Sequence, residues 1–257
     1  MDFFMVASFT DDVFKGNPAG VCLLHGDWLP DEIMQKIAAQ INLSETAFVL
    51  EHDGELGIRW FTPTTEVNLC GHATLAAAHV LRERFGGGMV FKSENHVLPV
   101  NFENDMLVLD FPMDKIWQIG GNDSLCVFNA APKEYWRGTD EYLLVFENEE
   151  QVKSAVCDFK KAANIDLSGF IITAKADKPG FDFVSRYFGP KIGINEDPVT
   201  GSAHTLLVPY WKQVTGMDEF RAAQLSKRGG ELFCRAVGER VKIAGKAVAF
   251  LVGEIII

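Results

Sequence analysis

The sequence predicts an α+β fold of two similar lobes, each a mostly antiparallel, curved sheet wrapped around a buried central helix. The first observation is residues 71–84, a helix-forming segment that is small and aliphatic on nearly every side. A helix that is apolar all round is a buried helix, and this one is too short to span a bilayer. The second is a similar segment at residues 201–215. Aligned on Gly71 and Gly201, both read glycine, a polar residue, alanine and an apolar run, which suggests a duplicated unit.

The elements around the two buried helices follow the same order in each half. The first half is expected to contain strands at 2–9 and 21–24, an amphipathic helix opening at 29–32, strands at 42–50 and 57–63, the buried helix, and strands at 89–91, 98–102 and 106–111. The second half is expected to contain a strand at 141–146, a helix at 148–162, strands at 170–174 and 181–188, the buried helix, and strands and turns at 221–226, 232–237 and 241–257.

Domain boundaries follow from this order. We expect a first lobe at residues 1–115 and a second at residues 116–257, with the last strand able to return to the first lobe. Residues 112–124 are rich in glycine and polar residues and are the predicted linker, in which Gly120–Ser124 is the predicted hinge.

Composition excludes several classes of protein. Of the 257 residues, 47% are hydrophobic and 23% charged, which excludes a disordered chain. The net charge of -11 argues against sequence-independent nucleic-acid binding but allows an anionic small molecule, because helix N-termini supply local positive potential. Five cysteines without a CxxC pair indicate reduced thiols. With no signal peptide or membrane span in the pattern, the expected compartment is the cytoplasm. No metal-ligand spacing appears, so no metal site is expected.

Glu45 is the first candidate catalytic residue. In the predicted strand it shares a face with Leu43, Ala47 and Val49, and a carboxylate on an apolar face usually has a partner or a function. A buried carboxylate has a raised pKa, which suits a general base that takes up a proton near neutrality. The alternative is a strand-end glutamate that reaches solvent.

Further candidates lie at the N-termini of the two buried helices. His72 is in the first turn of one helix, where its ring could hydrogen-bond or relay a proton. Asp197 precedes the other helix, although an acid there can simply complement the helix dipole. Ser202 and the N–H groups of Gly71 and Gly201 could hold a carboxylate or enolate oxygen.

Three other side chains lie in or beside these helices. Cys70 stands at a helix N-terminus, where the pKa of a thiol falls and the thiol can act as a base; the alternative is a small buried apolar residue. His79 and His204 lie deeper in their helices and are assigned to structure.

Six sequence blocks carry a resemblance to a known family. They are Phe14–Val21, Asn42–Val49, Arg59–Pro63, Cys70–Ala76, Glu196–Ala203 and Gln224–Glu231. In this order, over nearly the whole chain, they resemble the PhzF-type phenazine biosynthesis-like family. The resemblance implies the diaminopimelate epimerase-like fold, with the site in a cleft between the two lobes.

The resemblance also implies cofactor-independent isomerisation of a small carboxylate-bearing metabolite by proton abstraction and return. Glu45 matches the acid/base glutamate of the family. The other matching site positions are His72, Asp197 and Ser202, with the amides of Gly71 and Gly201 beside them. Asn68 and Thr205 stand where many members carry aspartate and cysteine, and neither touches the proposed chemistry.

Two alternative functions stay open. In related epimerases and proline racemases a cysteine pair acts across the cleft; Cys70 falls at the first of those positions and Thr200 at the second. A two-thiol racemase is therefore disfavoured, but a cysteine–threonine pair resembles the dehydratase branch, which keeps an epimerase or lyase using Cys70 as an alternative. The other alternative is a non-catalytic ligand-binding protein of the same fold. Cys70 and Thr200 are counted with Gly71 and Gly201 as substrate-binding residues, and a homodimer is left open.

Three expectations follow for the site itself. Glu45 should have a raised pKa and face the cleft. An anion should bind between the two helix N-termini. Ligand should close the lobes by a rigid rotation at Gly120–Ser124, because proton transfer to and from carbon is favoured where water is excluded.

Overall fold

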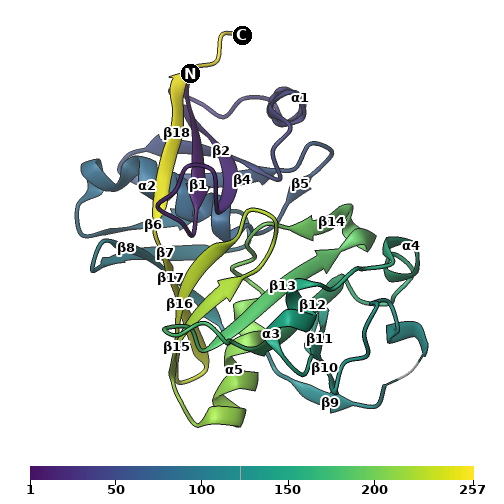
Figure 1. Ribbon diagram of the computed structural model, residues 1–257. Helices are drawn as coiled ribbons and strands as arrows, with labels where there is room; N and C mark the ends of the chain where they lie inside the picture. The colour runs from purple at the N-terminus through teal and green to yellow at the C-terminus, as the bar shows by residue number, and fades with distance from the viewer. Residues whose placement is uncertain (122) are drawn as a thin grey trace. The chain divides into compact units, whose positions relative to one another are not determined.

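The computed structural model describes residues 1–121 and 123–257 (Figure 1). It divides into two compact units, residues 1–110 with 244–257, and residues 111–243. The break therefore falls after residue 110 rather than at residue 115, and the last strand belongs to the first unit. Among the described residues, no helix is long and apolar enough to cross a membrane.

The first unit takes its elements from both ends of the chain. Residues 1–112 form β1 (Asp2–Ser8), β2 (Asn17–Leu24), α1 (Asp31–Ile41), β3 (Thr46–His52), β4 (Glu55–Phe61), β5 (Glu66–Val67), α2 (Gly71–Phe85), β6 (Gly88–Lys92), β7 (Val97–Glu103) and β8 (Met106–Pro112). The C-terminal strand β18 (Ala247–Glu254) pairs antiparallel with β1, which pairs with β2 on its other side (Figure 1).

The second unit has a similar content. Its elements are β9 (Trp117–Ile119), β10 (Glu134–Arg137), β11 (Glu141–Val145), α3 (Glu149–Lys153), α4 (Phe159–Ala162), β12 (Gly169–Lys175), β13 (Phe183–Gly189), β14 (Ile194–Asp197), α5 (His204–Thr215), β15 (Glu219–Gln224), β16 (Gly230–Val237) and β17 (Arg240–Gly245).

The two units share a topology. In the first, β2 and β3 are parallel and connected through α1, and β4 and β6 are parallel and connected through α2. In the second, β11 and β12 are parallel across α3 and α4, and β13 and β15 are parallel across α5. Parallel neighbours require such crossovers, whereas the remaining pairs, joined by short turns, are mostly antiparallel. The predicted α+β class and the duplicated order are confirmed.

Both predicted central helices are buried. In α2, Ala73, Leu75 and Ala76 are fully buried, and the helix packs on β1, β2, β3 and β18. In α5, Leu206, Leu207 and Val208 are buried. Small side chains in α2 let the surrounding strands pack close to the helix axis. This explains why the helix is rich in alanine rather than amphipathic.

Two strand boundaries differ from the prediction. The strand expected from Val21 begins at Asn17, because Pro18 pairs with β1 where β3 does not yet pair, and a proline is tolerated there. The strand expected over residues 42–50 begins at Thr46 instead, because Asn42 takes the left-handed conformation (φ 57°) that ends α1.

The helix predicted over residues 148–162 is two short helices. The α3 helix begins after Asn148, whose side chain accepts a hydrogen bond from the Gln151 backbone N–H, and α4 begins after Asp158, which accepts one from the Lys161 backbone N–H. Between them the chain passes beside Phe128, to which Cys157 forms an isolated β-bridge. Two strong N-capping residues in one segment mark two helix starts.

The predicted linker is partly a strand. Residues Trp117–Ile119 form β9, which pairs antiparallel with β10 of the second unit. Asn122, in the predicted hinge, lies outside the described residues. Rotation at this segment stays a prediction.

The loop that follows β1 contains a glycine under strict steric constraint. Gly16 has φ 67°, and a Cβ there would lie 2.3 Å from the backbone oxygen of Ser8. We expect Gly16→Ala to lower the free energy of unfolding by about 2–4 kcal/mol, because left-handed strain of about 1–2 kcal/mol adds to a clash with backbone that cannot move aside. Urea denaturation measures the change.

Gly54→Ala is the matched control for this experiment. Gly54 also has a positive φ, 79°, but no atom lies within 4 Å of the position that a Cβ would take there. This variant should lose only the strain term, about 1 kcal/mol. Equal losses for both variants would contradict the close approach at Gly16.

Candidate active site

Three of the predicted site residues form a buried cluster in the first unit. Glu45, just before β3, is 8% exposed, and its Oε2 lies 3.4 Å from Nε2 of His72. The other ring nitrogen of His72, Nδ1, lies 3.5 Å from Sγ of Cys70. His72 therefore stands between a carboxylate and a thiol, with one nitrogen toward each.

The start of α2 fixes this arrangement. Cys70 is the extended N-cap residue (φ -143°, ψ 109°), and its carbonyl accepts a hydrogen bond of 2.6 Å from the Thr74 hydroxyl. The Ser8 hydroxyl, fully buried in β1, donates a hydrogen bond of 2.8 Å to the His72 carbonyl. The Glu45 carbonyl accepts one from the Gly20 N–H of β2. Backbone contacts thus hold all three members of the cluster.

His72 is a neutral imidazole in this environment. Burial lowers its pKa to about 3, so the contact with Glu45 at neutral pH is not an ion pair. A neutral ring has one donor nitrogen and one acceptor nitrogen. The assignment that suits both neighbours places the Cys70 S–H toward Nδ1 and the Nε2–H toward the Glu45 carboxylate, a line of two contacts through one ring.

The same three residues are the candidate metal ligands of the first unit. Their ligand atoms lie within 4.8 Å of one another. However, Glu45 and Cys70 approach different nitrogens of His72, and a single ion can bind only one of them. The geometry favours two separate polar contacts to one ring over a three-ligand metal centre.

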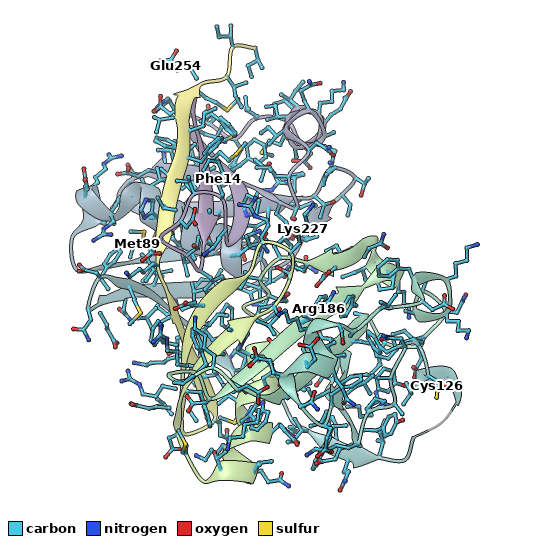
Figure 2. All side chains as sticks on the ribbon, in the orientation of Figure 1. Phe14, Met89, Cys126, Arg186, Lys227 and Glu254 are labelled. Atoms are coloured by element: carbon cyan, nitrogen blue, oxygen red, sulfur yellow. The ribbon has the colours of Figure 1, made fainter. Side chains whose placement is uncertain are left out.

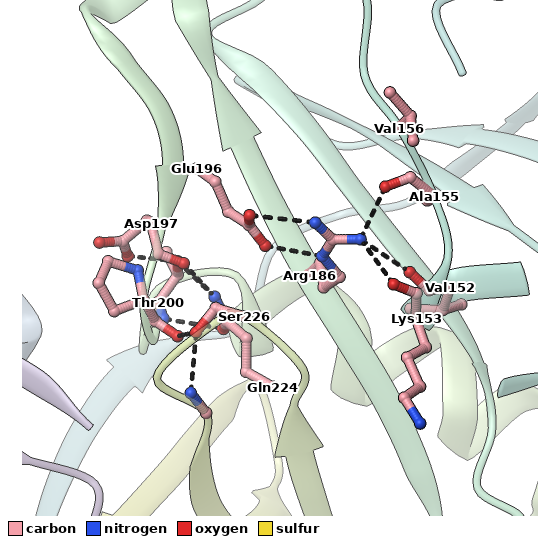
Figure 3. A network of polar contacts seen from close by, with 12 residues as sticks. Val152, Lys153, Ala155, Val156, Arg186, Glu196, Asp197, Thr200, Gln224 and Ser226 are labelled. Carbon is pink, nitrogen blue, oxygen red and sulfur yellow. Dashed lines mark hydrogen bonds and ion pairs between the residues drawn. The ribbon is translucent and has the colours of Figure 1, made fainter. Parts of the chain in front are cut away.

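A second polar cluster lies in the second unit and includes Asp197 and Thr200 (Figure 3). The Thr200 hydroxyl donates to the carboxylate of Asp197, the buried last residue of β14. Gln224, at the end of β15, connects both: its side-chain N–H donates to the Asp197 carbonyl at 2.9 Å, and its side-chain oxygen accepts from the Thr200 N–H at 2.8 Å. The carboxylate is thereby fixed on a short, hydrogen-bonded loop.

Ser202 and Gly201 belong to a turn rather than to the helix. The helix predicted from Gly201 begins at His204. Residues 201–203 form a tighter turn, in which each carbonyl accepts a hydrogen bond from the N–H group three residues later. Ser202 is exposed and Gly201 is buried. Gly71, by contrast, is the first residue of α2. The two helix starts therefore differ, although the sequences align.

His204 has the structural role predicted for it. Its ring is fully buried, Nδ1 donates to the Thr200 carbonyl at 3.0 Å, and burial lowers its pKa to about 4. It stacks obliquely on Phe183, with ring centroids 5.9 Å apart. It therefore steadies the turn that carries Thr200.

Arg186 anchors the strand that ends at Asp197 (Figure 3). Its guanidinium makes two hydrogen bonds, of 2.6 and 3.0 Å, with the carboxylate of Glu196 on β14. The same group donates to the carbonyls of Val152, Lys153 and Ala155 at the end of α3. This half-buried guanidinium makes five contacts with acceptor atoms, which fixes β14 and explains why α3 ends here.

Sequence reasoning missed two of the residues that position these clusters. Ser8 lies between Ala7 and Phe9 in an apolar strand, and nothing in this local sequence indicates that its hydroxyl has a specific partner. Gln224 stood in one of the family-like blocks without an assigned role. An amide in a buried strand needs several partners, and that requirement was the available signal.

A pocket in the first unit does not coincide with the predicted site. It has a volume of about 600 Å³, and Trp28, Arg59, Glu66, Asn68 and Lys92 are among its lining residues. None of the eight predicted site residues lines it. Its charged side chains are largely paired, as Arg59 contacts Glu66 and Asp31.

Comparison with known proteins gives a consistent result. A family model described as phenazine biosynthesis-like protein matches residues 6–253. An uncharacterized isomerase from Pseudomonas aeruginosa is 47% identical over 99% of this chain and 98% of its own length. The crystal structure of a PhzF-family phenazine biosynthesis protein from Enterococcus faecalis superposes with a TM-score of 0.95 at 40% identity, covering 100% of this chain and 99% of that one.

A more distant structure shares the fold alone. A probable proline racemase from Agrobacterium radiobacter superposes with a TM-score of 0.60 at 9% identity, covering 99% of this chain and 92% of that one. The predicted diaminopimelate epimerase-like architecture is confirmed by these likenesses.

The buried histidines predict a pH dependence of stability. The pKa values of His72 and His204 in the folded protein, about 3 and about 4, lie below the value of about 6.5 in the unfolded chain. The unfolded state therefore binds protons more readily. The stability contributed by the two neutral histidines is fully present above pH 6.5. It is lost as the pH falls toward their pKa values in the folded protein, by about 2 kcal/mol per histidine at pH 5. Urea denaturation at pH 7 and pH 5 should show the difference, and His72→Gln should reduce it by about half.

The Arg186 fork predicts a large stability effect in the second unit. Arg186→Met leaves the Glu196 carboxylate and the α3 carbonyls without their partner, and should lower the free energy of unfolding by about 3–5 kcal/mol. The control is Lys212→Met, which removes an exposed ion pair with Asp218 and should cost at most about 1 kcal/mol. A loss of under about 1 kcal/mol for Arg186→Met, no larger than that of an exposed pair, would refute the anchoring role.

Proposed function

The chain belongs to the phenazine biosynthesis-like (PhzC/PhzF) family, and from this premise we propose that it is an isomerase that moves a proton within a small carboxylate-bearing metabolite. Glu45 is the acid/base residue of this proposal, and the reaction uses no cofactor. The name isomerase is carried by the relative from Pseudomonas aeruginosa, at 47% identity over nearly the full length.

The observation that carries the proposal is the environment of Glu45. The carboxylate is buried and faces a neutral imidazole instead of bulk water. A carboxylate that has lost most of its hydration is a stronger base, since its charged form is less stabilised. Such a group can take a proton from a carbon next to a carbonyl or a double bond, which a hydrated surface glutamate does poorly.

The substrate and the Glu45 side chain together account for every proton and electron in the proposed step. The Glu45 carboxylate takes a proton from a C–H bond, and the electron pair of that bond forms a new double bond while the neighbouring double bond shifts. The carboxylic acid then returns the proton to a different carbon. No electron is gained or lost, so no redox partner is needed. The His72 N–H beside Glu45 can hold the carboxylate in one rotamer through both halves of the step.

The N-terminal N–H groups of α2 are the proposed anchor for the substrate carboxylate. Gly71 opens the helix, and Cys70 makes no side-chain cap hydrogen bond there. In a chain of net charge -11, an acidic substrate needs such a local positive end. In the second unit, Asp197 and Ser202 keep their proposed catalytic roles, and Thr200 and Gly201 their proposed roles in substrate binding.

The contact between Cys70 and His72 supports a second candidate function. A thiol 3.5 Å from an imidazole nitrogen can pass its proton to the ring and act as the base, as an epimerase or lyase would require. In that case Cys70 and not Glu45 would face the substrate. A protein that only binds its ligand is the third candidate.

Solvent deuterium exchange separates the three candidates. The full-length protein is incubated in D2O with a panel of small unsaturated carboxylic acids, and deuterium in the recovered acids is measured by mass spectrometry. We expect Glu45→Gln to lower the exchange rate about 10²–10⁴-fold, because the amide has a similar shape and cannot accept the proton. Cys70→Ala should keep the rate within about tenfold of the wild-type rate, since the thiol is not the base in this proposal.

The opposite outcomes assign the other functions. A rate that survives Glu45→Gln and is lost in Cys70→Ala identifies the thiol as the base. If neither the wild-type protein nor either variant exchanges deuterium into an acid that is shown to bind, the chain is a binding protein. Unchanged melting temperatures of both variants establish that the fold is intact in each case.

A further inference from the structure

The pocket in the first unit lies where strand β4 lacks a neighbour. On the side of β4 away from β3, β6 pairs with residues 56–57 and β5 pairs with residues 60–61 (Figure 1). Ile58 and Arg59 lie between these pairings, and no strand in the described part of the chain pairs with them on that side. Both residues line the pocket, together with the ends of β5 and β6, so the cavity of about 600 Å³ occupies this gap. Its volume is that of a small-molecule site.

Trp28, in the loop before α1, forms one wall of this pocket. Gly57 leaves room for its indole ring, because a Cβ at Gly57 would lie 2.8 Å from Cζ2 of Trp28. The guanidinium carbon of Arg59 lies 5.7 Å from the centroid of the same ring. Trp28 is nevertheless 36% exposed. A ring that is held against a strand and is still partly open offers a flat apolar surface to a ligand.

The positive charges that line the pocket already have partners. Nε and Nη2 of Arg59 donate to the Glu66 carboxylate at 2.7 and 2.6 Å, and Nη1 donates to Asp31 at 2.8 Å. Lys92, the other lining cation, contacts Glu55. Both cations are therefore neutralised by carboxylates, and the pocket offers little attraction to an anion.

The polar side chains that remain without a partner are of a different kind. Glu94, Asn95 and Asn68 line the pocket, are exposed, and make no hydrogen bond or ion pair with any residue that the structure describes. Glu94 and Asn95 lie in the turn after β6, the strand on which Figure 2 labels Met89. The two amides can donate or accept, whereas the carboxylate only accepts. The one lining charge that lacks a partner is thus negative, which favours a cationic ligand.

We propose that this pocket binds a small organic cation, an amine whose ammonium group contacts the Glu94 carboxylate and whose apolar body lies on the Trp28 ring. A hydrogen bond between two charged groups is stronger than a neutral one, and a cation beside an indole gains further attraction. The amide oxygens of Asn68 and Asn95 are additional acceptors for the ammonium N–H groups.

The charge of the whole chain is consistent with this ligand. A net charge of -11 raises the local concentration of small cations around the protein. None of the eight predicted site residues lines the pocket, so the amine site does not depend on the proposed isomerase reaction.

The test compares two probes of nearly equal shape by isothermal titration calorimetry of the full-length chain. The probes are 2-phenylethylamine, which is a cation at pH 7, and 2-phenylethanol, which is neutral. We expect a dissociation constant below about 1 mM for the amine, and binding of the alcohol at least about fivefold weaker, because the alcohol lacks the charge that Glu94 and Trp28 attract.

Two variants assign the site. Glu94→Gln should raise the dissociation constant of the amine at least about threefold and leave that of the alcohol unchanged, since it removes only the charge. Trp28→Leu should weaken both probes at least about threefold, because it removes the ring on which their bodies lie. Glu94 is exposed, so an unchanged melting temperature should show that its variant folds normally.

Glu83→Gln is the matched control. Glu83 is exposed on α2 and does not line the pocket, so this variant loses the same charge elsewhere in the first unit. It should leave the affinity for the amine unchanged. Equal losses in Glu83→Gln and Glu94→Gln would show that the acidic chain attracts the amine without a site.

Two results with the wild-type protein would also overturn the proposal. One is the absence of measurable heat with the amine at concentrations up to about 10 mM, which would show that the pocket takes no ligand of this class. The other is equal affinity for the amine and the alcohol, which would show that the pocket recognises the ring and not the charge.

Discussion

The burial of α2 within its own sheet is the constraint on which the first unit depends. The first two turns of this helix are buried, so the polar groups at its N-terminus must find partners there. Cys70, His72 and Glu45 meet at that place, and Ser8 and Thr74 satisfy the adjacent carbonyls. The requirement that stabilises the fold therefore also concentrates titratable side chains at one point, in surroundings that exclude water.

The second unit applies the same topology with different local chemistry. Its helix α5 starts three residues later than the alignment on the glycines suggests, and the preceding turn is held by Gln224 and Asp197 rather than by a side chain at the helix terminus. His204 supports this turn from within the core, whereas His72 faces a carboxylate in its own unit. Duplicated architecture thus preserves the strands and crossovers while the polar groups diverge, and function has to be argued from each group separately.

The sequence predicted the α+β class and both buried helices because apolar segments of this length have few other stable environments. It identified Glu45 although the observed strand does not extend that far: the glutamate is buried just before β3, so its burial was predicted correctly and its place within a strand was wrong. The split of residues 148–162 was missed although Asn148 and Asp158 are both N-capping residues, and the Arg186 contacts at the end of α3 come from more than thirty residues away in the chain. Contacts of that kind, like those of Ser8 and Gln224, follow from packing and leave no periodic trace.

The return of the last strand to the first unit has a consequence for synthesis. Strand β1 is flanked by β2 on one side and by β18 on the other, yet residues 111–243 are translated between them. All strands of the second unit have left the ribosome while the first unit still lacks β18, because β18 is the last strand of the chain. During that interval the backbone of β1, with Phe3, Phe4 and Met5, is an open edge on a nascent chain. The first unit is completed only when the final strand emerges.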